Sequence, residues 1–320
     1  MKTTMTWRRG AVLALPLVLL ATVFAGCSTD SGASPASEQA STAPASPTQS
    51  AEPTTLAFIA DFGRCDDAQA EVATMVLGWE ADAIATAGDN TYVEEGCEPF
   101  TESVGDYYGD YVTGPEGPRF WPALGNHDYE NANAGLDAYR DYFSYLPDSA
   151  DPEQRWYDMK VGGIHLFVLD NDAPAADLAA QQDWLESTSA RVRAEEPDAW
   201  NIAVFHRPAH TSGIHPGFEP MSEAAGWDYT GWGIDVVVVG HQHIYEDVLV
   251  DGLHHVTVGE GANGSERPCP VEAERVEGSQ VCIDGPGAML VTSTPASLTL
   301  EWRMPGDGAD VVKDTIDLTR

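Results

Sequence analysis

Two histidines one residue apart, His241 and His243, follow a run of four valines at residues 236–239. Imidazole nitrogens bind borderline metals such as zinc and iron, so such a pair suits a metal site. Two histidines on a surface loop are the alternative interpretation, and the H-x-H spacing alone favours neither. The choice depends on the side chains that end the other apolar runs of the chain.

Metal-ligating side chains end four further apolar runs. The runs at residues 54–61, 82–89, 119–126 and 200–206 end at Asp61, Asp89, Asn126 and His206. Tyr92 follows the second run closely. Carboxylate, amide, phenol and imidazole donors without thiolate suit iron, zinc or manganese. The donors exceed the needs of one tetrahedral ion, so we predict two ions that share a carboxylate.

Predicted helices separate several of these runs, at residues 66–80 and 175–195. Alternating strands and helices predict an α/β fold with a largely parallel sheet. In such sheets the ligand crevice lies beyond the carboxyl ends of the strands. We therefore expect the polar side chains to converge in space although they are far apart in the sequence.

The ordered motifs D-F-G, G-D-N-x-Y, G-N-H-D, V-F-H and G-H-x-H resemble those of the calcineurin-like metallophosphoesterases. The tyrosine of G-D-N-T-Y is similar to that of the purple acid phosphatase branch. The resemblance covers about residues 56–260 and implies a two-sheet β-sandwich flanked by helices, in the compact single-domain form. Ala60 stands where that branch usually has glycine, at a position that supplies no ligand.

The resemblance also implies a set of metal ligands. Asp61, Tyr92 and His243 would bind the first ion, Asn126, His206 and His241 the second, and Asp89 would bridge the two. Because phenol ordinarily has a pKa of about 10, a tyrosinate ligand at acidic pH requires a strongly Lewis-acidic ion. We therefore expect Fe³⁺ at the first site and divalent iron, zinc or manganese at the second.

His127 in G-N-H-D would be the proton donor to the leaving group, by the same resemblance. His215, nine residues after His206, matches a histidine that contacts substrate, and His210 competes for that role. Asp128 either orients a neighbouring group or faces solvent. Two ions clamp a phosphoryl oxygen and activate water, so the expected reaction is hydrolysis of phosphate monoesters.

Two other functions are considered. A phosphodiesterase or nucleotidase would use the same metal core, and a monoester assayed against a diester separates these enzymes from a monoesterase. A surface lipoprotein that keeps its metals only for stability belongs to another class. His127 argues against it, because the residue is not needed to hold the metals.

The N-terminus predicts export and lipid anchoring. Arg8-Arg9 precede an apolar run at residues 11–25, and the V-F-A-G-C ending resembles the lipobox of bacterial lipoproteins, with Phe24 in place of the usual leucine. The arginine pair leaves general secretory and twin-arginine export open. We predict a signal peptide at 1–26, lipid on Cys27, and a disordered Ser/Thr/Ala/Pro-rich tether at 27–55. The catalytic domain is expected at 56–320, on the outer face of the cell membrane or secreted.

The formal net charge of −35 lies on residues 56–320, because residues 1–55 contain three basic and three acidic side chains. Such a surface repels nucleic acid and anionic membranes. We expect small phosphate esters as substrates, no nucleic-acid partner, and membrane contact only through the lipid.

Four cysteines remain after Cys27, an even number that predicts disulfides in an exported protein. Of three possible pairings we favour 65–97, since these residues follow two loops expected at one metal site, and 269–282, which flank one polar insertion. A zinc site is the alternative, although no C-x-x-C spacing supports it.

Several other polar residues receive no functional role. His254 and His255 lie on one predicted strand, where alternation places one inward and one outward. His165 is interpreted as a core histidine. Residues 170–172 follow another strand end and are interpreted as a possible wall of the site.

Overall fold

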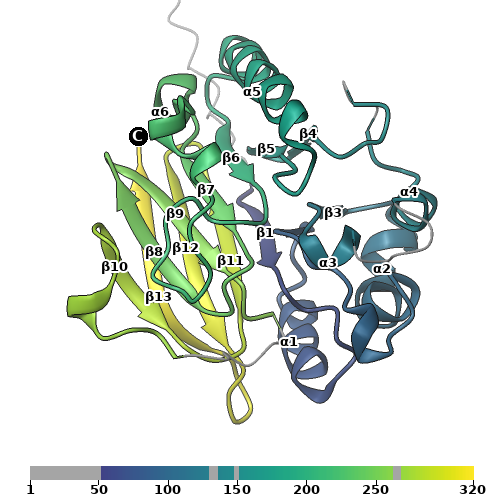
Figure 1. The fold of residues 1–320 in the computed structure, drawn as a ribbon. Coiled ribbons are helices and arrows are strands. Elements are labelled where there is room, and N and C mark those ends of the chain that lie inside the picture. Colours follow the sequence, from purple (N-terminus) through teal and green to yellow (C-terminus); the bar gives the residue numbers. More distant parts are fainter. Residues whose placement is uncertain (1–51, 130–135, 148–150, 262–267) are drawn as a thin grey trace, which may run out of the picture. The chain divides into compact units, whose positions relative to one another are not determined.

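The computed structural model describes residues 52–129, 136–147, 151–261 and 268–320 (Figure 1). It confirms the predicted α/β fold with two sheets flanked by helices. The predicted signal peptide, Cys27 and most of the tether lie outside the described residues. No helix within these ranges has the length and apolar character needed to cross a membrane.

The first sheet has six strands in the order β13-β12-β11-β1-β2-β3. Their bounds are β1 Thr54–Ile59, β2 Ala83–Thr86, β3 Phe120–Pro122, β11 Ala288–Ser293, β12 Ser297–Met304 and β13 Val311–Thr319. β1, β2 and β3 are parallel to one another, and β11 to β13 continue the sheet in antiparallel pairs. β1 begins two residues before the predicted domain start at 56.

The second sheet has seven strands in the order β10-β8-β9-β7-β6-β5-β4. Their bounds are β4 Tyr157–Val161, β5 Ile164–Val168, β6 Trp200–Val204, β7 Val236–Val239, β8 Tyr245–Val250, β9 Leu253–Val258 and β10 Ser279–Ile283. β5, β6, β7 and β9 are parallel, while β4, β8 and β10 pair antiparallel. The parallel arrangement was thus predicted correctly for the strands that precede the candidate ligands.

Helices flank both sheets. The α-helices are α1 Asp67–Gly78, α2 Asp106–Thr113, α3 Asn126–Tyr129, α4 Asp137–Tyr142, α5 Ala175–Glu195 and α6 Tyr229–Trp232. A π-helix at Thr101–Gly105 and short 3₁₀ helices at Val93–Glu95, Glu219–Met221, Glu223–Ala225 and Glu272–Glu274 lie in the connections. In Figure 1, α1 and α2 lie beside the first sheet, and α5 and α6 lie near β5, β6 and β7.

The valine strand β7 is buried on both faces. Val236 and Val238 belong to the core between the sheets, whereas Val237 and Val239 pack in a second core with Leu185 of α5. Alternate side chains of a strand point to opposite faces, so a strand covered on both sides is apolar throughout. Packing on both faces therefore holds β7, and the start of the loop that carries His241 and His243, in a fixed position.

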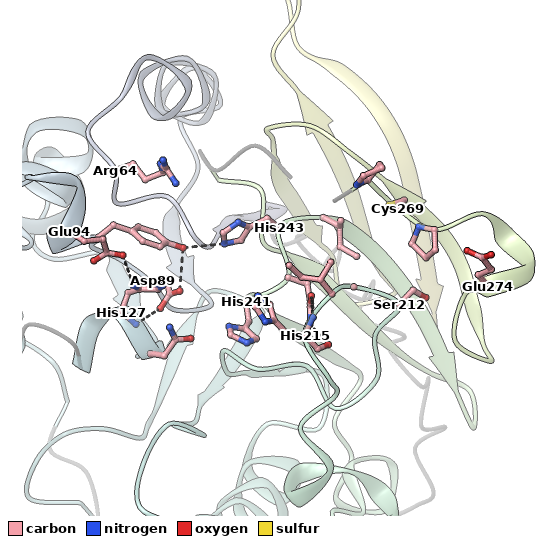
Figure 2. A pocket seen from close by; sticks show the side chains of 18 residues that line it. Arg64, Asp89, Glu94, His127, Ser212, His215, His241, His243, Cys269 and Glu274 are labelled. Atoms are coloured by element: carbon pink, nitrogen blue, oxygen red, sulfur yellow. Dashed lines mark hydrogen bonds and ion pairs between the residues drawn. The ribbon is translucent and has the colours of Figure 1, made fainter. Parts of the chain in front are cut away.

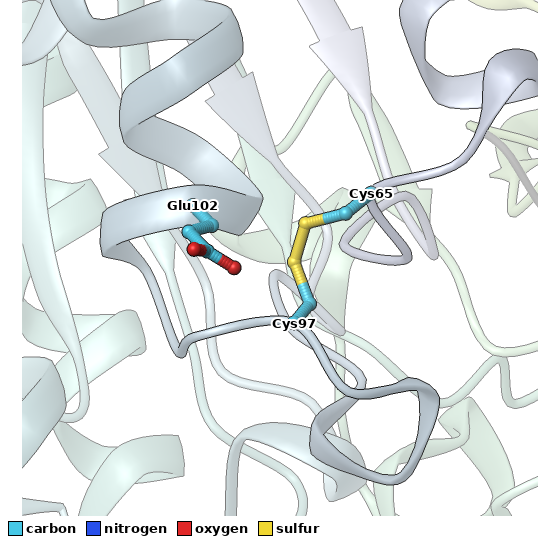
Figure 3. A group of neighbouring side chains, drawn as sticks. All are labelled: Cys65, Cys97 and Glu102. Carbon is cyan, nitrogen blue, oxygen red and sulfur yellow. A yellow bond between two sulfur atoms is a disulfide. The ribbon is translucent and has the colours of Figure 1, made fainter.

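Both predicted disulfides are present, Cys65–Cys97 and Cys269–Cys282. The first, shown in Figure 3, joins the loop after β1 to the loop after β2. Glu102 lies beside this pair, and the three side chains form a possible metal-ligand group. Sulfurs that bond each other are not thiolate ligands, so this disulfide rules out the zinc alternative at Cys65 and Cys97.

Candidate metal centre

Three of the predicted ligands adopt a left-handed backbone within three residues after their strands end. The φ angles are 55° at Asp61, 51° at Asp89 and 68° at His241. Residues other than glycine rarely adopt this conformation, and each instance costs about 1 kcal/mol or more. The repeated turn bends the chain away from each sheet at the carboxyl ends of β1, β2 and β7.

Glycines of the motifs let these turns approach one another. A Cβ atom on Gly125 would lie 2.3 Å from Oδ1 of Asp89, and one on Gly240 would lie 2.6 Å from Oδ2 of Asp61. Neither distance leaves room for a side chain. The glycines of G-N-H-D and G-H-x-H are therefore required for close packing of the loops around the carboxylates.

One donor group gathers around the Tyr92 hydroxyl. Its oxygen lies 3.3 Å from Oδ1 of Asp61, 3.3 Å from Oδ2 of Asp89 and 3.4 Å from Nε2 of His243. Figure 2 shows Asp89 and His243 on the pocket wall. Both carboxylates are buried, and Tyr92 is only 3% exposed. The four side chains assigned to the first ion thus meet at one point, although they come from three separate loops.

A second donor group gathers around His206, after β6. Its Nε2 lies 3.2 Å from Oδ1 of Asn126 and 3.2 Å from Oδ2 of Asp89. The other ring nitrogen, Nδ1, lies 2.8 Å from the carbonyl oxygen of Ala87. Because a carbonyl only accepts, Nδ1 carries hydrogen and Nε2 faces the other donors. Asp89 belongs to both groups through the same carboxylate oxygen.

His241 completes the second group. Its ring centroid lies 5.0 Å from that of His206, and its backbone N–H donates to Oδ2 of Asp61 at 2.9 Å. Candidate ligand atoms of Asp89, His206 and His241 all lie within 4.8 Å of one another. The candidate set is therefore compact before any ion is considered.

Electrostatics favour the ligand-competent forms of Asp89 and His241, whereas His206 is protonated at physiological pH and would give up the proton on Nε2 to an ion. Burial raises the pKa of Asp89, but the neighbouring His206 outweighs burial and holds this pKa well below its usual range. Burial lowers the pKa of His206, but Asp89 outweighs it and raises the pKa to about 10. Burial, assisted by His206 and Arg207, lowers the pKa of His241 to about 2. Asp89 is thus anionic and His241 neutral at physiological pH.

Five of the candidate ligands line a pocket of about 740 Å³, namely Asp89, Tyr92, Asn126, His241 and His243, whereas the fully buried Asp61 and His206 do not. His215 also lines it, with its ring centroid 4.6 Å from that of His241. Gln242 holds His215 in place, donating from Nε2 to its carbonyl and accepting its N–H at Oε1. His210 is not among the lining residues. Of the two competing histidines, His215 is the one at the pocket.

Comparison with known families agrees with this geometry. The family model for calcineurin-like phosphoesterase matches residues 54–245, which is more than half of the chain. The chain belongs to the calcineurin-like phosphoesterase family. No curated protein matches the phosphoesterase by sequence.

Solved structures share the fold of this phosphoesterase. The yellow lupin (Lupinus luteus) purple acid phosphatase PPD1 matches with a TM-score of 0.65 and 17% identity, over 84% of this chain and 54% of the lupin chain. GAP50 of Plasmodium matches with a TM-score of 0.64 and 16% identity, over 83% of this chain and 89% of the GAP50 chain. A dimetal phosphatase from Danio rerio matches with a TM-score of 0.56 and 10% identity, over 81% of this chain and 98% of the Danio rerio chain. This chain therefore spans about half of the lupin protein.

Members of the calcineurin-like phosphoesterase family depend on two metal ions, and the residues at this site fit two ions. Asp61 and Asp89 are buried carboxylates whose neighbours are imidazole, phenol and amide groups. Buried charges require paired cations or coordination to metal. Donors of this type suit iron, zinc or manganese. Asp89 contacts both donor groups through Oδ2, so it would be the carboxylate available to both ions.

His127 lies at the edge of the phosphoesterase pocket. Its backbone N–H donates to Oδ1 of Asp89 at 2.9 Å, and its ring lies over Tyr92 with a centroid distance of 4.3 Å. Nδ1 lies 2.8 Å from Oε1 of Glu94. Glu94 was missed in the sequence, although it follows Tyr92 by two residues. Its carboxylate lies at ion-pair distance from the His127 ring.

Two arginines near the site were also missed. Arg64 lines the pocket, and its guanidinium lies 5.9 Å from the ring centroid of Tyr92. Nη1 of Arg207 lies 2.8 Å from Nε2 of His241, and its Nε donates to Asp172 at 2.7 Å. Each arginine comes just after a predicted ligand motif, D-F-G or V-F-H, and that position was the available signal.

Asp128 is buried, which excludes the solvent-facing interpretation. Its carboxylate accepts from the backbone N–H of Asn90 at 3.0 Å, from Nδ2 of Asn90 at 2.9 Å and from the N–H of Gly125 at 2.8 Å. Asp128 thereby ties the loop that carries Asp89 to the loop that carries Asn126. It positions the loops that carry the candidate ligands.

Residues 170–172, interpreted as a possible wall of the site, are not among the residues that line the pocket and instead position Arg207. Asn171 accepts from the N–H of Arg207 at 3.0 Å and donates to its carbonyl at 2.8 Å. With Asp172 on the guanidinium, this segment fixes the backbone and side chain of Arg207. Asp170 is buried, accepts from the Tyr129 hydroxyl, and has a pKa raised to about 7 by burial.

Proposed function

We propose that this phosphoesterase is an exported, lipid-anchored acid phosphatase of the purple acid phosphatase type, which hydrolyses small phosphate monoesters. The observation that carries the proposal is the Tyr92 hydroxyl, which lies within 3.4 Å of Asp61, Asp89 and His243. A tyrosine among carboxylate and imidazole donors is the feature that separates this type from the wider family.

The ligand assignment follows the two donor groups. Asp61, Tyr92 and His243 would hold Fe³⁺, Asn126, His206 and His241 would hold divalent iron, zinc or manganese, and Asp89 would serve both ions. When bound, the ions clamp the phosphoryl group and lower the pKa of water. The neutral ring of His241 suits ligation, because burial keeps its lone pair unprotonated.

His127 would supply the proton to the leaving alkoxide. Glu94 lies against Nδ1 at 2.8 Å, so Nε2 is the nitrogen left to give a proton. Water would lose one proton to solvent, its oxygen would form the new P–O bond as the ester P–O bond breaks, and the alkoxide would take the proton of His127 and leave as an alcohol. Solvent would then return a proton to His127. General acid catalysis of this kind contributes about 10²–10⁴ to the rate.

Arg64 and Arg207 would draw the phosphate inward. The surface is strongly acidic, with a formal net charge of −35, and repels anions at long range. Guanidinium groups bind phosphate oxygens well, and one beside His241 and one beside Tyr92 flank the candidate metal centre. A small ester needs only these local cations, whereas a polyanion meets the acidic exterior.

Residues 1–26 would be the signal peptide and residues 27–55 the tether, with lipid on Cys27. Both disulfides support an oxidising compartment outside the cytoplasm. The catalytic domain would begin near the start of β1 at Thr54.

The substrate class is tested with the purified full chain and two substrates, p-nitrophenyl phosphate and bis-p-nitrophenyl phosphate, over acidic to alkaline pH. The proposal predicts a kcat/KM for the monoester at least tenfold above that for the diester, with its maximum on the acidic side. A diester preference would assign the metal core to a phosphodiesterase instead.

A further inference from the structure

A second group of metal-ligating side chains lies outside the phosphatase pocket. His210 is in the loop after β6, Glu223 opens the 3₁₀ helix Glu223–Ala225, and His255 is on β9. Nε2 of His210 lies 2.6 Å from Oε2 of Glu223, and Nε2 of His255 lies 2.9 Å from Oε1 of the same carboxylate. The three candidate ligand atoms lie within 4.8 Å of one another.

One contact of this group is close without being a hydrogen bond. Nε2 of His255 and Oε1 of Glu223 are 2.9 Å apart, yet within the described residues neither buried atom has an aligned hydrogen-bond partner. Buried polar atoms are rarely left in this state. Two ligand-type atoms this close, with no aligned hydrogen bond between them, suit two ligands of one ion.

The protonation states also suit a cation. Burial lowers the pKa of His255, which keeps its ring neutral at neutral pH. Burial raises the pKa of Glu223, but the hydrogen bond with His210 and the nearby ring of His255 outweigh burial and hold this pKa well below its usual range. An anionic carboxylate with two imidazoles is a donor set found at zinc sites.

The group is distinct from the candidate metal centre but mechanically connected to it. None of its three residues lines the pocket, whereas residues 212–215, which lie between His210 and Glu223 in the chain, do. An ion here would join both ends of this segment to β9. The segment carries His215, whose ring centroid lies 4.6 Å from that of His241.

We propose that His210, Glu223 and His255 form a third metal site, which binds a zinc-like divalent cation and anchors the pocket wall that carries His215. The inference rests on this group alone and holds whether or not the pocket hydrolyses monoesters. It also gives His255 a role that the sequence pattern did not indicate.

The test counts zinc ions in full-chain protein whose main centre is removed by Asp89→Ala. After metal removal and titration with Zn²⁺, this variant is expected to bind one equivalent tightly. Adding His210→Gln or His255→Gln should abolish that equivalent. Adding His254→Gln should not, because His254 is the neighbouring histidine on β9 and pairs with Asp247 at 2.9 Å instead.

A Co²⁺ titration gives an independent readout. The Asp89→Ala protein should develop a visible absorption spectrum from one bound Co²⁺, and the additional His210→Gln change should remove it. His210 lies in a loop with 24% of its side chain exposed, so this variant is expected to fold even if His255→Gln does not. An Asp89→Ala protein that binds no Zn²⁺ or Co²⁺, or a double variant with His210→Gln that binds as much as Asp89→Ala, would overturn the proposal.

Discussion

The Tyr92 hydroxyl oxygen lies 3.3 Å from Oδ2 of Asp89, and His206 Nε2 lies 3.2 Å from that same oxygen. One carboxylate oxygen therefore joins a phenol-centred donor group to an imidazole-centred one. The proposed two-ion centre depends on this relationship, because a ligand shared in this way couples the occupancy of both ions.

Asp89→Ala is expected to empty both ion positions, since each loses the shared carboxylate. Asn126→Ala removes one amide oxygen beside His206 and should deplete mainly the second ion. Metal analysis of the two purified variants, each compared with wild type, measures the difference. Equal metal content in the two variants would contradict the assignment of Asp89 as the bridge.

His127→Gln is expected to lower kcat for a monoester by about 10²–10⁴ while both ions stay bound, because the proton donor is lost and no proposed ligand changes. His254→Gln is the control, since that histidine lies on β9 and is not among the residues that line the pocket. Unchanged turnover in His127→Gln would favour a protein that keeps its metals only for stability.

The strand ends of the site were predictable because their signals are local. An apolar run that stops at a carboxylate or imidazole predicts a buried strand and places the polar residue just beyond its carboxyl end. β7 and His241 illustrate this. The strands themselves are shorter than those runs. β1 ends at Ile59, two residues before Asp61, because the chain turns before the ligand is reached.

The partners across loops were not predictable in this way. Glu94 contacts His127 and Asn171 contacts Arg207 only after separate loops converge. His255 looked like an ordinary strand residue, and its meeting with Glu223 depends on the register of β9 in the second sheet. Such contacts follow from tertiary packing, for which a single sequence carries no periodic signal.

Glu260→Gln is expected to change how stability depends on pH. Burial raises the pKa of Glu260 to about 8, with Asp284 and Asp61 adding and a Gly285 backbone hydrogen bond opposing. Above its ordinary pKa of 4.5, the Glu260 carboxyl has lost its proton in the unfolded chain but keeps it in the folded state. This difference lowers the free energy of unfolding as pH rises from 4.5 to about 8.

The Glu260→Gln variant has no carboxyl to titrate, so its free energy of unfolding lacks this decrease with pH. It should be more stable than wild type at pH 8.5 by a few kcal/mol, and similar to wild type near pH 4.5. Urea unfolding of both proteins at the two pH values measures the difference. Identical pH profiles would show that Glu260 does not titrate as described.

Cys27→Ala is expected to block lipid attachment and signal cleavage at that site. Protein from cells that express the variant should lose the mass of the lipid and leave the tightly bound membrane fraction, provided the signal is cleaved elsewhere. Membrane fractionation with intact-mass analysis tests this. Wild-type protein whose mature mass shows no lipid on Cys27 would contradict the prediction.

The central claim is most directly tested by metal analysis of the purified full-chain protein together with its visible absorption spectrum, measured for wild type and Tyr92→Phe. We predict two ions in the main centre, one of them iron, and a charge-transfer band from tyrosinate bound to Fe³⁺. Tyr92→Phe should lose the band but retain part of the activity, because Asp61, Asp89 and His243 still hold the ion. A colourless wild-type enzyme that is fully active with only zinc or manganese would contradict the claim.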